Sequence, residues 1–312
     1  MRQHQVTVEV LGPWSLATSR AFWEGFTPAA LPPHTGQQAS PNIQDNQDEQ
    51  DNQDNQDNQE RLRTVFRVER DWSRAEVDVT QRRGTARITV TGDGDLDAAA
   101  AQAGRFLSLD VDARAWPDVA RRDPVIADAQ QQLPGLRPCG FHSPYEAAAW
   151  AVLSQRIRIT QAARLRDDLV RRHGDHGAFP APQLLRTLAL DLPGRKSEYL
   201  HAVADAALDG QLDGVALRAL DPDQAVHTVQ QVKGLGPFAA ELVVIRGANA
   251  RDVLPQHERR LNSEVTHRYG PGRTLTDVSQ AWRPFRTWAA VLLRALREQQ
   301  AHQIPGRRSP AA

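Results

Sequence analysis

The chain has 312 residues, about the length of two domains and enough to bury a substantial hydrophobic core. Hydrophobic residues make up 40% of the sequence and charged residues 24%, as in ordinary globular proteins. The single cysteine, Cys139, excludes a disulfide framework and also an iron–sulfur cluster, which needs about four thiolates. No apolar stretch approaches the roughly 18 residues of a membrane span, and the N-terminus lacks the apolar core of a signal peptide. We therefore expect a cytoplasmic protein without a membrane partner.

The formal net charge of zero conceals an uneven distribution of charge. Residues 45–60 read DNQDEQDNQDNQDNQE and contain seven acidic residues and no basic one. The rest of the chain therefore has 38 basic against 31 acidic residues, an excess of seven positive charges. An excess of this sign attracts phosphate, so the composition favours a polyanionic partner.

The N-terminal part of the sequence predicts an α+β domain over residues 1–132. The acidic repeat lacks aromatic and aliphatic side chains, so it cannot bury enough apolar area to offset its ordering entropy. We expect a disordered insertion at about 34–60, in a surface loop of this domain. Alternating apolar and polar residues on both sides predict an antiparallel sheet with one or two helices. The strands are expected at 5–10, 64–68, 74–80 and 85–91, and a helix at 95–107.

From residue 138 to about 300 the hydrophobic period is helical, which predicts an all-α domain. Ser143, Pro144 and Glu146 have the spacing of a capping box with proline at the first helical position. Residues 301–312 are expected to form a disordered tail. Helices are expected from 144 to 153, after a break from 159 to 173, and then at 182–189, 196–208, 214–220, 223–232, 237–245, 259–268 and 278–297.

The most informative motif is the turn Gly234-Leu235-Gly236-Pro237 between two helical patterns. Glycine permits backbone conformations that point successive amides outward, and the start of the following helix adds positive potential. The motif therefore predicts a site for a phosphate group of a nucleic acid. The alternative is an ordinary helix–turn–helix corner that uses glycine for compactness.

This stretch resembles a known family. The run GLGPFAAELVVIRGANARDVLPQHERRL is similar to the hairpin and following segment of the helix-hairpin-helix DNA glycosylases, of the bacterial 3-methyladenine DNA glycosylase II type. Residues 138–165, 192–210 and 282–288 match further parts of the family in the same order. The resemblance covers most of 138–297, and residues 4–28 and 61–132 are more weakly similar to the family's N-terminal domain. It implies an α+β domain followed by an all-α helix-hairpin-helix glycosylase domain.

The resemblance also implies roles for individual residues. Gly234 and Gly236 match the glycines whose amides hold the DNA backbone, sometimes through a bound monovalent cation; no other cofactor or metal is expected. Phe238 matches an aromatic pocket residue at the position where bifunctional relatives carry a Schiff-base lysine, which implies a monofunctional hydrolase. Phe285 matches an aromatic that stacks against the flipped base. Core packing is the alternative for both phenylalanines.

Three arginines complete the implied DNA contacts. Arg156 matches the residue that the family inserts into the gap left by the extruded nucleotide, where a family member has an aliphatic side chain. Stacking in the gap and a solvated loop position are equally compatible with the sequence. Arg158 and Arg164 would extend a basic strip along the same face.

Glu258 matches the catalytic acid, which is an aspartate in the family. Base excision passes through an oxocarbenium-like sugar that a nearby carboxylate stabilises. Glutamate has the same charge and one more methylene group. His257 is adjacent and could form a hydrogen bond with Glu258, or it could be structural. Asp252 is an alternative carboxylate with the character of a turn residue.

The sequence thus predicts a monomeric, monofunctional DNA repair glycosylase that flips a damaged, alkylated purine out of duplex DNA and hydrolyses its N-glycosidic bond. A non-catalytic protein that binds damaged DNA on the same scaffold is the first alternative. A helical interaction module unrelated to DNA is the second, and the zero net charge is its best argument.

Overall fold

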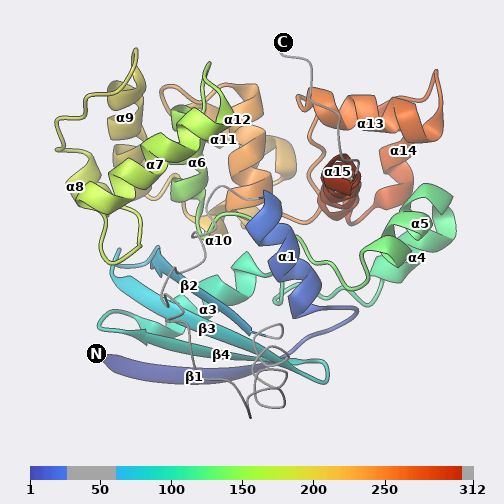
Figure 1. Cartoon of the computed structure of the whole chain (residues 1–312), viewed down its shortest axis with the longest axis horizontal. Coiled ribbons are helices and arrows are strands. Elements are labelled where there is room, and N and C mark those ends of the chain that lie inside the picture. Colours follow the sequence, from blue (N-terminus) through green and yellow to red (C-terminus); the bar gives the residue numbers. More distant parts are fainter. Residues whose placement is uncertain (27–60, 304–312) are drawn as a thin grey trace, which may run out of the picture.

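The computed structural model describes residues 1–26 and 61–303, with side chains for residues 1–25 and 61–300. The acidic insertion expected at about 34–60 and residues 304–312 of the expected tail lie outside the described residues. Figure 1 shows an antiparallel sheet at one end of the molecule, with two groups of helices above it. Within the described residues, no helix is both long enough and apolar enough to cross a membrane.

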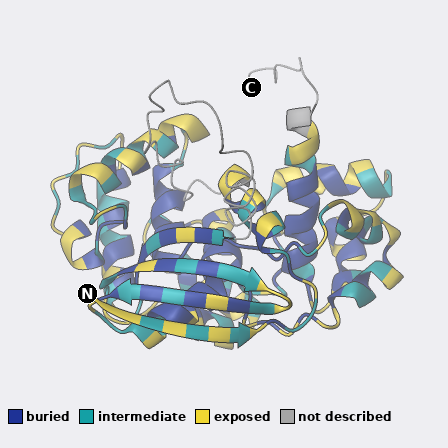
Figure 2. Cartoon of the chain, turned by 60° about the horizontal axis from the view of Figure 1, so that its bottom comes forward, coloured by how far each residue is buried: buried dark blue, intermediate teal, exposed yellow. Residues whose placement is uncertain are grey.

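The sheet has four strands in the order β1-β4-β3-β2, and all neighbours are antiparallel. Every second residue is buried along β4, and along β3 as far as Val79, while the residues between them are more exposed, as expected for a sheet with one covered face (Figure 2). The alternating pattern in the sequence is therefore confirmed. The strands are β1 (Arg2–Glu9), β2 (Arg61–Arg67), β3 (Arg74–Arg82) and β4 (Thr85–Gly92).

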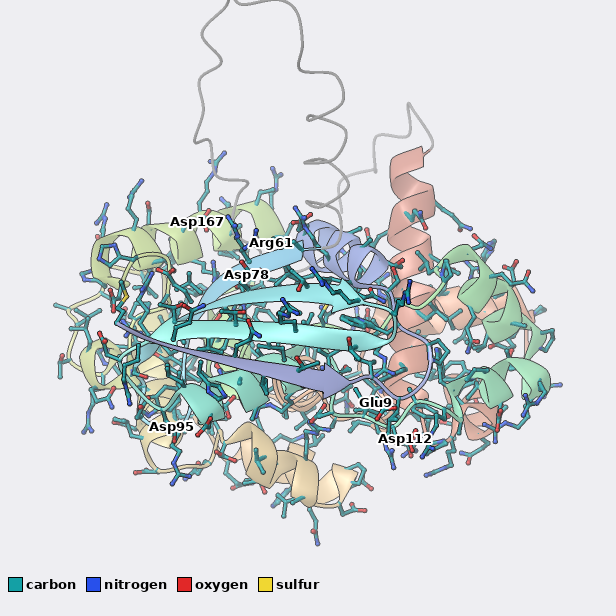
Figure 3. The ribbon with its side chains drawn as sticks, turned by 90° about the horizontal axis from the view of Figure 1, so that it is seen from below. Glu9, Arg61, Asp78, Asp95, Asp112 and Asp167 are labelled. Carbon is teal, nitrogen blue, oxygen red and sulfur yellow. The ribbon has the colours of Figure 1, made fainter. Side chains whose placement is uncertain are left out.

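The outer face of the sheet is polar. Arg61 on β2 and Asp78 on β3 point toward each other on this face (Figure 3), and Nε of Arg61 lies 2.8 Å from Oδ1 of Asp78. Arg63 lies 3.2 Å from the same carboxylate. Exposed ion pairs of this kind contribute about 0–1 kcal/mol. The buried core therefore lies on the other face of the sheet.

The first buried core joins the sheet to helices from both ends of the chain. Asp95 caps the helix that covers the inner face of the sheet, by accepting a hydrogen bond from the Ala98 amide. Trp282, Trp288 and Leu296 belong to the same core as the strands, so the buried cores do not divide near residue 132. The helices of this core are α1 (Leu16–Phe26), α3 (Leu96–Phe106), α4 (Trp116–Arg122), α5 (Pro124–Gln132), α13 (Arg259–Tyr269), α14 (Leu275–Ser279) and α15 (Arg286–Gln303).

Within the described residues, the second core contains no strand and lies among the helices α6 to α12 (residues 144–242), on the left of Figure 1. Ser143 caps its first helix as predicted, by accepting a hydrogen bond from the Glu146 amide at 3.1 Å. Its elements are α6 (Pro144–Leu153), α7 (Ile159–His173), α8 (Pro182–Leu185), α9 (Lys196–Leu208), α10 (Gly214–Ala219), α11 (Pro222–Gln230), α12 (Pro237–Leu242) and the π-helical turn η1 (Val243–Gly247).

Several helix predictions differ from the structure. The described part of residues 1–132 contains four helices, α1, α3, α4 and α5, where one or two were expected, and the helix predicted at 182–189 ends at Leu185. The helix predicted at 278–297 is wrong as a single element: α14 ends at Ser279, a 3-10 turn η2 (Gln280–Trp282) follows, and α15 begins at Arg286. Pro284 causes the break, because proline lacks an amide donor and its ring clashes with the preceding turn. The helix predicted at 237–245 gives way to η1 after Leu242, where the Ala248 amide donates to the Val243 carbonyl at 2.8 Å.

Candidate active site

The predicted hairpin consists of α11, α12 and the turn between them, and its two glycines differ in what the fold requires. Gly234 has a φ of +93°, which L side chains rarely adopt, and a Cβ atom there would lie 2.4 Å from Cγ of Tyr199. Gly236 is extended, with a φ of −82°, and nothing lies within 4 Å of its Cβ position. The fold therefore needs glycine at 234, whereas Gly236 is an exposed backbone position in open space.

The loop after α6 is tied to this hairpin by hydrogen bonds. Gln155 donates from Nε2 to the Gly234 carbonyl at 2.7 Å. Lys196 on α9 donates from its amino group to two carbonyls at the end of α6, including that of Gln155 at 2.8 Å. Arg156 and Arg158 follow on this loop with exposed side chains. The loop with the two predicted DNA-binding arginines and the hairpin with the two glycines therefore lie side by side.

A pocket of about 120 Å³ opens beside α12. Phe238, at the start of α12, has 53% of its surface exposed and forms part of the wall, and Glu258 lines the same pocket. The structure thus brings together two residues that lie 20 positions apart in the sequence. The pocket is lined by Phe238, Glu241, Leu242, Ile245, Arg246, Pro255, Glu258, Ala290, Val291 and Arg294.

Glu258 immediately precedes α13, and α15 fixes its carboxylate. Oε1 of Glu258 accepts a hydrogen bond of 2.5 Å from Nε of Arg294, while 27% of the Glu258 side chain stays exposed. Arg294 also donates from Nη2 to Glu298, one turn further along α15, at 3.1 Å. The guanidinium therefore orients the Glu258 carboxylate and places a positive charge directly beside it.

A second guanidinium lies in the wall of the pocket. Burial lowers the pKa of Arg246 to about 10, so this residue remains charged at neutral pH. Its Nη2 donates to the Cys139 carbonyl at 3.1 Å, and its guanidinium lies 5.2 Å from the ring centroid of Phe22. Arg246 belongs to the π-helical turn η1, and such turns occur frequently at functional sites.

Sequence reasoning missed Glu241 as part of the site. This carboxylate is buried, with 5% exposure, and it accepts hydrogen bonds from the backbone amides of Gln256 at 3.1 Å and His257 at 3.0 Å. It also lies 2.7 Å from Nδ1 of His257. Glu241 therefore anchors the segment that leads into Glu258. A charged residue among the apolar side chains of the helix that follows the glycine turn is the signal that could have identified it.

No family model matches the chain. In sequence it is similar to DNA-3-methyladenine glycosylase 2 of Escherichia coli, with 28% identity over 174 residues, which are 51% of this chain and 59% of that protein. It is also 23% identical over 207 residues to a DNA-3-methyladenine glycosylase of Bacillus subtilis, covering 60% of this chain and 68% of that protein. In structure it is similar to a 3-methyladenine DNA glycosylase from Archaeoglobus fulgidus, with a TM-score of 0.68 and 16% sequence identity. That match covers 96% of this chain and 100% of the other.

The fold is that of the helix-hairpin-helix DNA glycosylases. The fold class and the family resemblance predicted from the sequence are thereby confirmed.

Phe285 does not line the pocket of this glycosylase fold. It is 1% exposed, and its ring centroid lies 5.6 Å from that of Trp116 and 5.2 Å from that of Trp288. The residue directly follows Pro284, before α15 begins, and its ring packs into the first core against α4. Its position therefore corresponds to core packing, the alternative that the sequence left open.

Asp252, the alternative carboxylate, also lies outside the Phe238 pocket. Its Oδ1 accepts hydrogen bonds from the backbone amide of Arg286 at 3.0 Å and from Nε of Arg286 at 2.9 Å. These contacts tie the turn after η1 to the start of α15, which fits the character of a turn residue. Within the described residues, no group of three or more His, Cys, Asp or Glu is placed to hold a metal ion.

Proposed function

We propose that the chain is a DNA glycosylase that hydrolyses the N-glycosidic bond of an alkylated purine extruded from duplex DNA, and that it acts as a monomer. The observation that carries the proposal is the pocket shared by Glu258 and Phe238, next to an exposed hairpin in a glycosylase fold. The names of its relatives in Escherichia coli and Bacillus subtilis support 3-methyladenine as the class of damage. Extrusion is required because the bond to be broken is inaccessible inside the base stack.

The pocket supplies the two interactions that the reaction needs. The Glu258 carboxylate stabilises positive charge that develops on the sugar as the base departs. The exposed ring of Phe238 offers an aromatic face to the base, and a cationic alkylated purine gains roughly 0.5–2 kcal/mol there relative to its neutral parent. Arg246 and Arg294 balance the charges of Glu258 and Glu241 in the wall, so selectivity for a cationic base rests on Phe238.

The lysines of the chain support a monofunctional hydrolase. The sequence contains only two, Lys196 and Lys233. The amino group of Lys196 donates to carbonyls at the end of α6, and that of Lys233 lies 2.5 Å from Glu198. A Schiff base with the sugar requires an amine at the reacting carbon, and the lining of the Phe238 pocket contains no lysine. We therefore expect base release without cleavage of the DNA backbone.

Duplex DNA would approach across the hairpin and the adjacent loop. The Gly236 backbone is exposed, and Arg156 and Arg158 extend the same face with two exposed cations. Backbone amides and arginine side chains contact phosphates without reading sequence, which suits an enzyme that searches for damage. The monovalent cation that the family resemblance implies at the hairpin belongs to this proposal.

The test is release of bases from randomly methylated duplex DNA, with the released bases identified by chromatography. Glu258→Gln keeps nearly the same shape and removes the charge, so the single-turnover rate should fall about 100- to 1000-fold while affinity for damaged duplex persists. Glu298→Gln is the matched control, because Glu298 binds the same arginine and is absent from the pocket lining. Equal rates for Glu258→Gln and the wild type would refute the role of Glu258.

A damage-binding protein without catalysis is the second candidate. The observation that favours it is the Arg294 guanidinium, which already occupies Oε1 of Glu258. Tight, salt-dependent binding of alkylated duplex without release of any base would establish this candidate in place of the enzyme.

A further inference from the structure

A carboxylate in the wall of the pocket, Glu241, forms a pair with the imidazole of His257, which is not itself a lining residue. Glu241 is buried, whereas the side chain of His257 is 51% exposed, and 2.7 Å separates Oε1 of Glu241 from Nδ1 of His257. Both oxygens of Glu241 also accept backbone amides from the His257 segment. An ionised carboxylate only accepts hydrogen bonds, so Nδ1 of His257 must be the donor.

This hydrogen bond determines what the rest of the imidazole can do. When Nδ1 carries the proton, Nε2 holds the lone pair and can accept a proton. Within the described residues, Nε2 forms no hydrogen bond or ion pair, and half of the side chain faces solvent. The buried carboxylate also stabilises the imidazolium that would result from protonation. In this pair the imidazole of His257 is therefore arranged as a general base, and the carboxylate of Glu241 is the group that orients it.

The position of the pair connects it to the proposed reaction. Glu241 and Glu258 line the same pocket, and His257 is joined to the first by a hydrogen bond and to the second by a peptide bond. One oxygen of Glu258 is occupied by Arg294. The imidazole therefore belongs to the residue directly before the carboxylate that would face the sugar, and it is held by a second carboxylate of the same pocket.

We propose that His257 is the general base that activates the hydrolytic water, with Glu241 as its positioning residue; this inference rests on the proposed glycosylase function. The water oxygen forms a bond to C1′ of the deoxyribose as the bond from C1′ to the base nitrogen breaks. The electron pair of the broken bond leaves with the base, which becomes neutral if it was a cationic alkylated purine. The proton of the water passes to Nε2 of His257 and then to solvent. Glu258 stabilises the charge on the sugar and is not required to accept this proton.

The decisive variant is His257→Asn. The asparagine amide nitrogen can replace Nδ1 as the donor to Glu241, so the segment before α13 stays anchored, but nothing replaces Nε2. The control is His267→Asn, the same exchange at an exposed histidine on α13. Each protein is mixed in excess with a duplex that carries one 7-methylguanine, and the excision rate at saturation and the half-saturating protein concentration are measured in H2O and in D2O.

We expect the saturating rate of His257→Asn to fall about 100-fold, the usual contribution of a general base, with an unchanged half-saturating concentration. The solvent isotope effect of the wild type should also shrink in this variant, because the proton transfer is no longer assisted. His257→Gln should behave in the same way, since its amide cannot accept the proton. His267→Asn should match the wild type in every measurement.

Three results would overturn the inference. A wild-type rate in a folded His257→Asn protein would show that Nε2 takes no part. A change confined to the half-saturating concentration would identify His257 as a contact to DNA phosphate instead. A wild-type protein that releases no 7-methylguanine and no other methylated base would refute the proposed function itself, and with it the need for a base.

Discussion

Replacing Gly236 by valine tests whether the hairpin holds DNA through its backbone. In the structure this position tolerates a side chain: its φ of −82° is ordinary, and apart from its two chain neighbours nothing lies within 4 Å of the site of a Cβ atom. We therefore expect the stability of the folded protein to change by no more than about 0.5 kcal/mol, as for most surface substitutions. If the valine side chain weakens DNA binding by more than this, the cause must be its contact with the DNA that approaches the hairpin.

The expected loss of DNA affinity follows from the hydrogen bonds that would be blocked. A hydrogen bond from an amide to a charged group is worth about 1.5–3 kcal/mol, and each 1.4 kcal/mol corresponds to a factor of about ten. Gly236→Val should therefore weaken binding of duplex DNA by about 10- to 100-fold, equally for all sequences, because phosphate contacts do not read bases. Gly236→Ala, with a smaller side chain, should have a smaller effect.

The assay is a duplex-binding titration by fluorescence anisotropy at several salt concentrations, with thermal unfolding measured on the same samples. Gly234→Ala is the contrasting variant: its positive φ and the 2.4 Å approach to Tyr199 should destabilise the protein by at least about 1 kcal/mol. Unchanged DNA affinity in a folded Gly236→Val protein would refute the role of the hairpin backbone.

Three further predictions concern the rest of the molecule. Burial raises the pKa of Glu69 from 4.5 to about 7, so the folded protein holds this proton more tightly than the unfolded chain. The proton therefore adds to the free energy of unfolding; this contribution is complete below about pH 4.5 and is lost as the pH rises through about 7. Urea unfolding at pH 5 and pH 8 should therefore show a weaker pH dependence for Glu69→Gln than for the wild type, and an equal dependence would contradict the assignment. Burial raises the pKa of the Cys139 thiol to about 12, so mass spectrometry should detect modification by iodoacetamide only after unfolding. Deletion of residues 45–60 should leave the melting temperature unchanged and should not weaken DNA binding, because this tract has no apolar side chains; a large fall in melting temperature would show that it packs.

The sequence by itself determined the four strands, most helices of the second core and the family resemblance, whereas it did not locate α1, α4 or α5. Residues that alternate between apolar and polar over β3 and β4 predict strands because successive side chains point to opposite faces. Ser143 and the turn at Gly234 are local signals, since a cap or a tight turn depends on a few adjacent residues. The placement of Glu258 near Phe238 followed from collinear similarity to a family, and the pocket that they share agrees with it.

Only the tertiary structure decided which side chains meet around these residues. Arg294 reaches Glu258 across 36 positions, and Glu241 reaches His257 across 16, so no local pattern could reveal either contact. Phe285 faces the first core instead of the pocket because the break at Pro284 and the packing of α15 fix its direction. Local signals specify the backbone of each element, whereas the direction of a side chain in a pocket depends on how distant elements pack together.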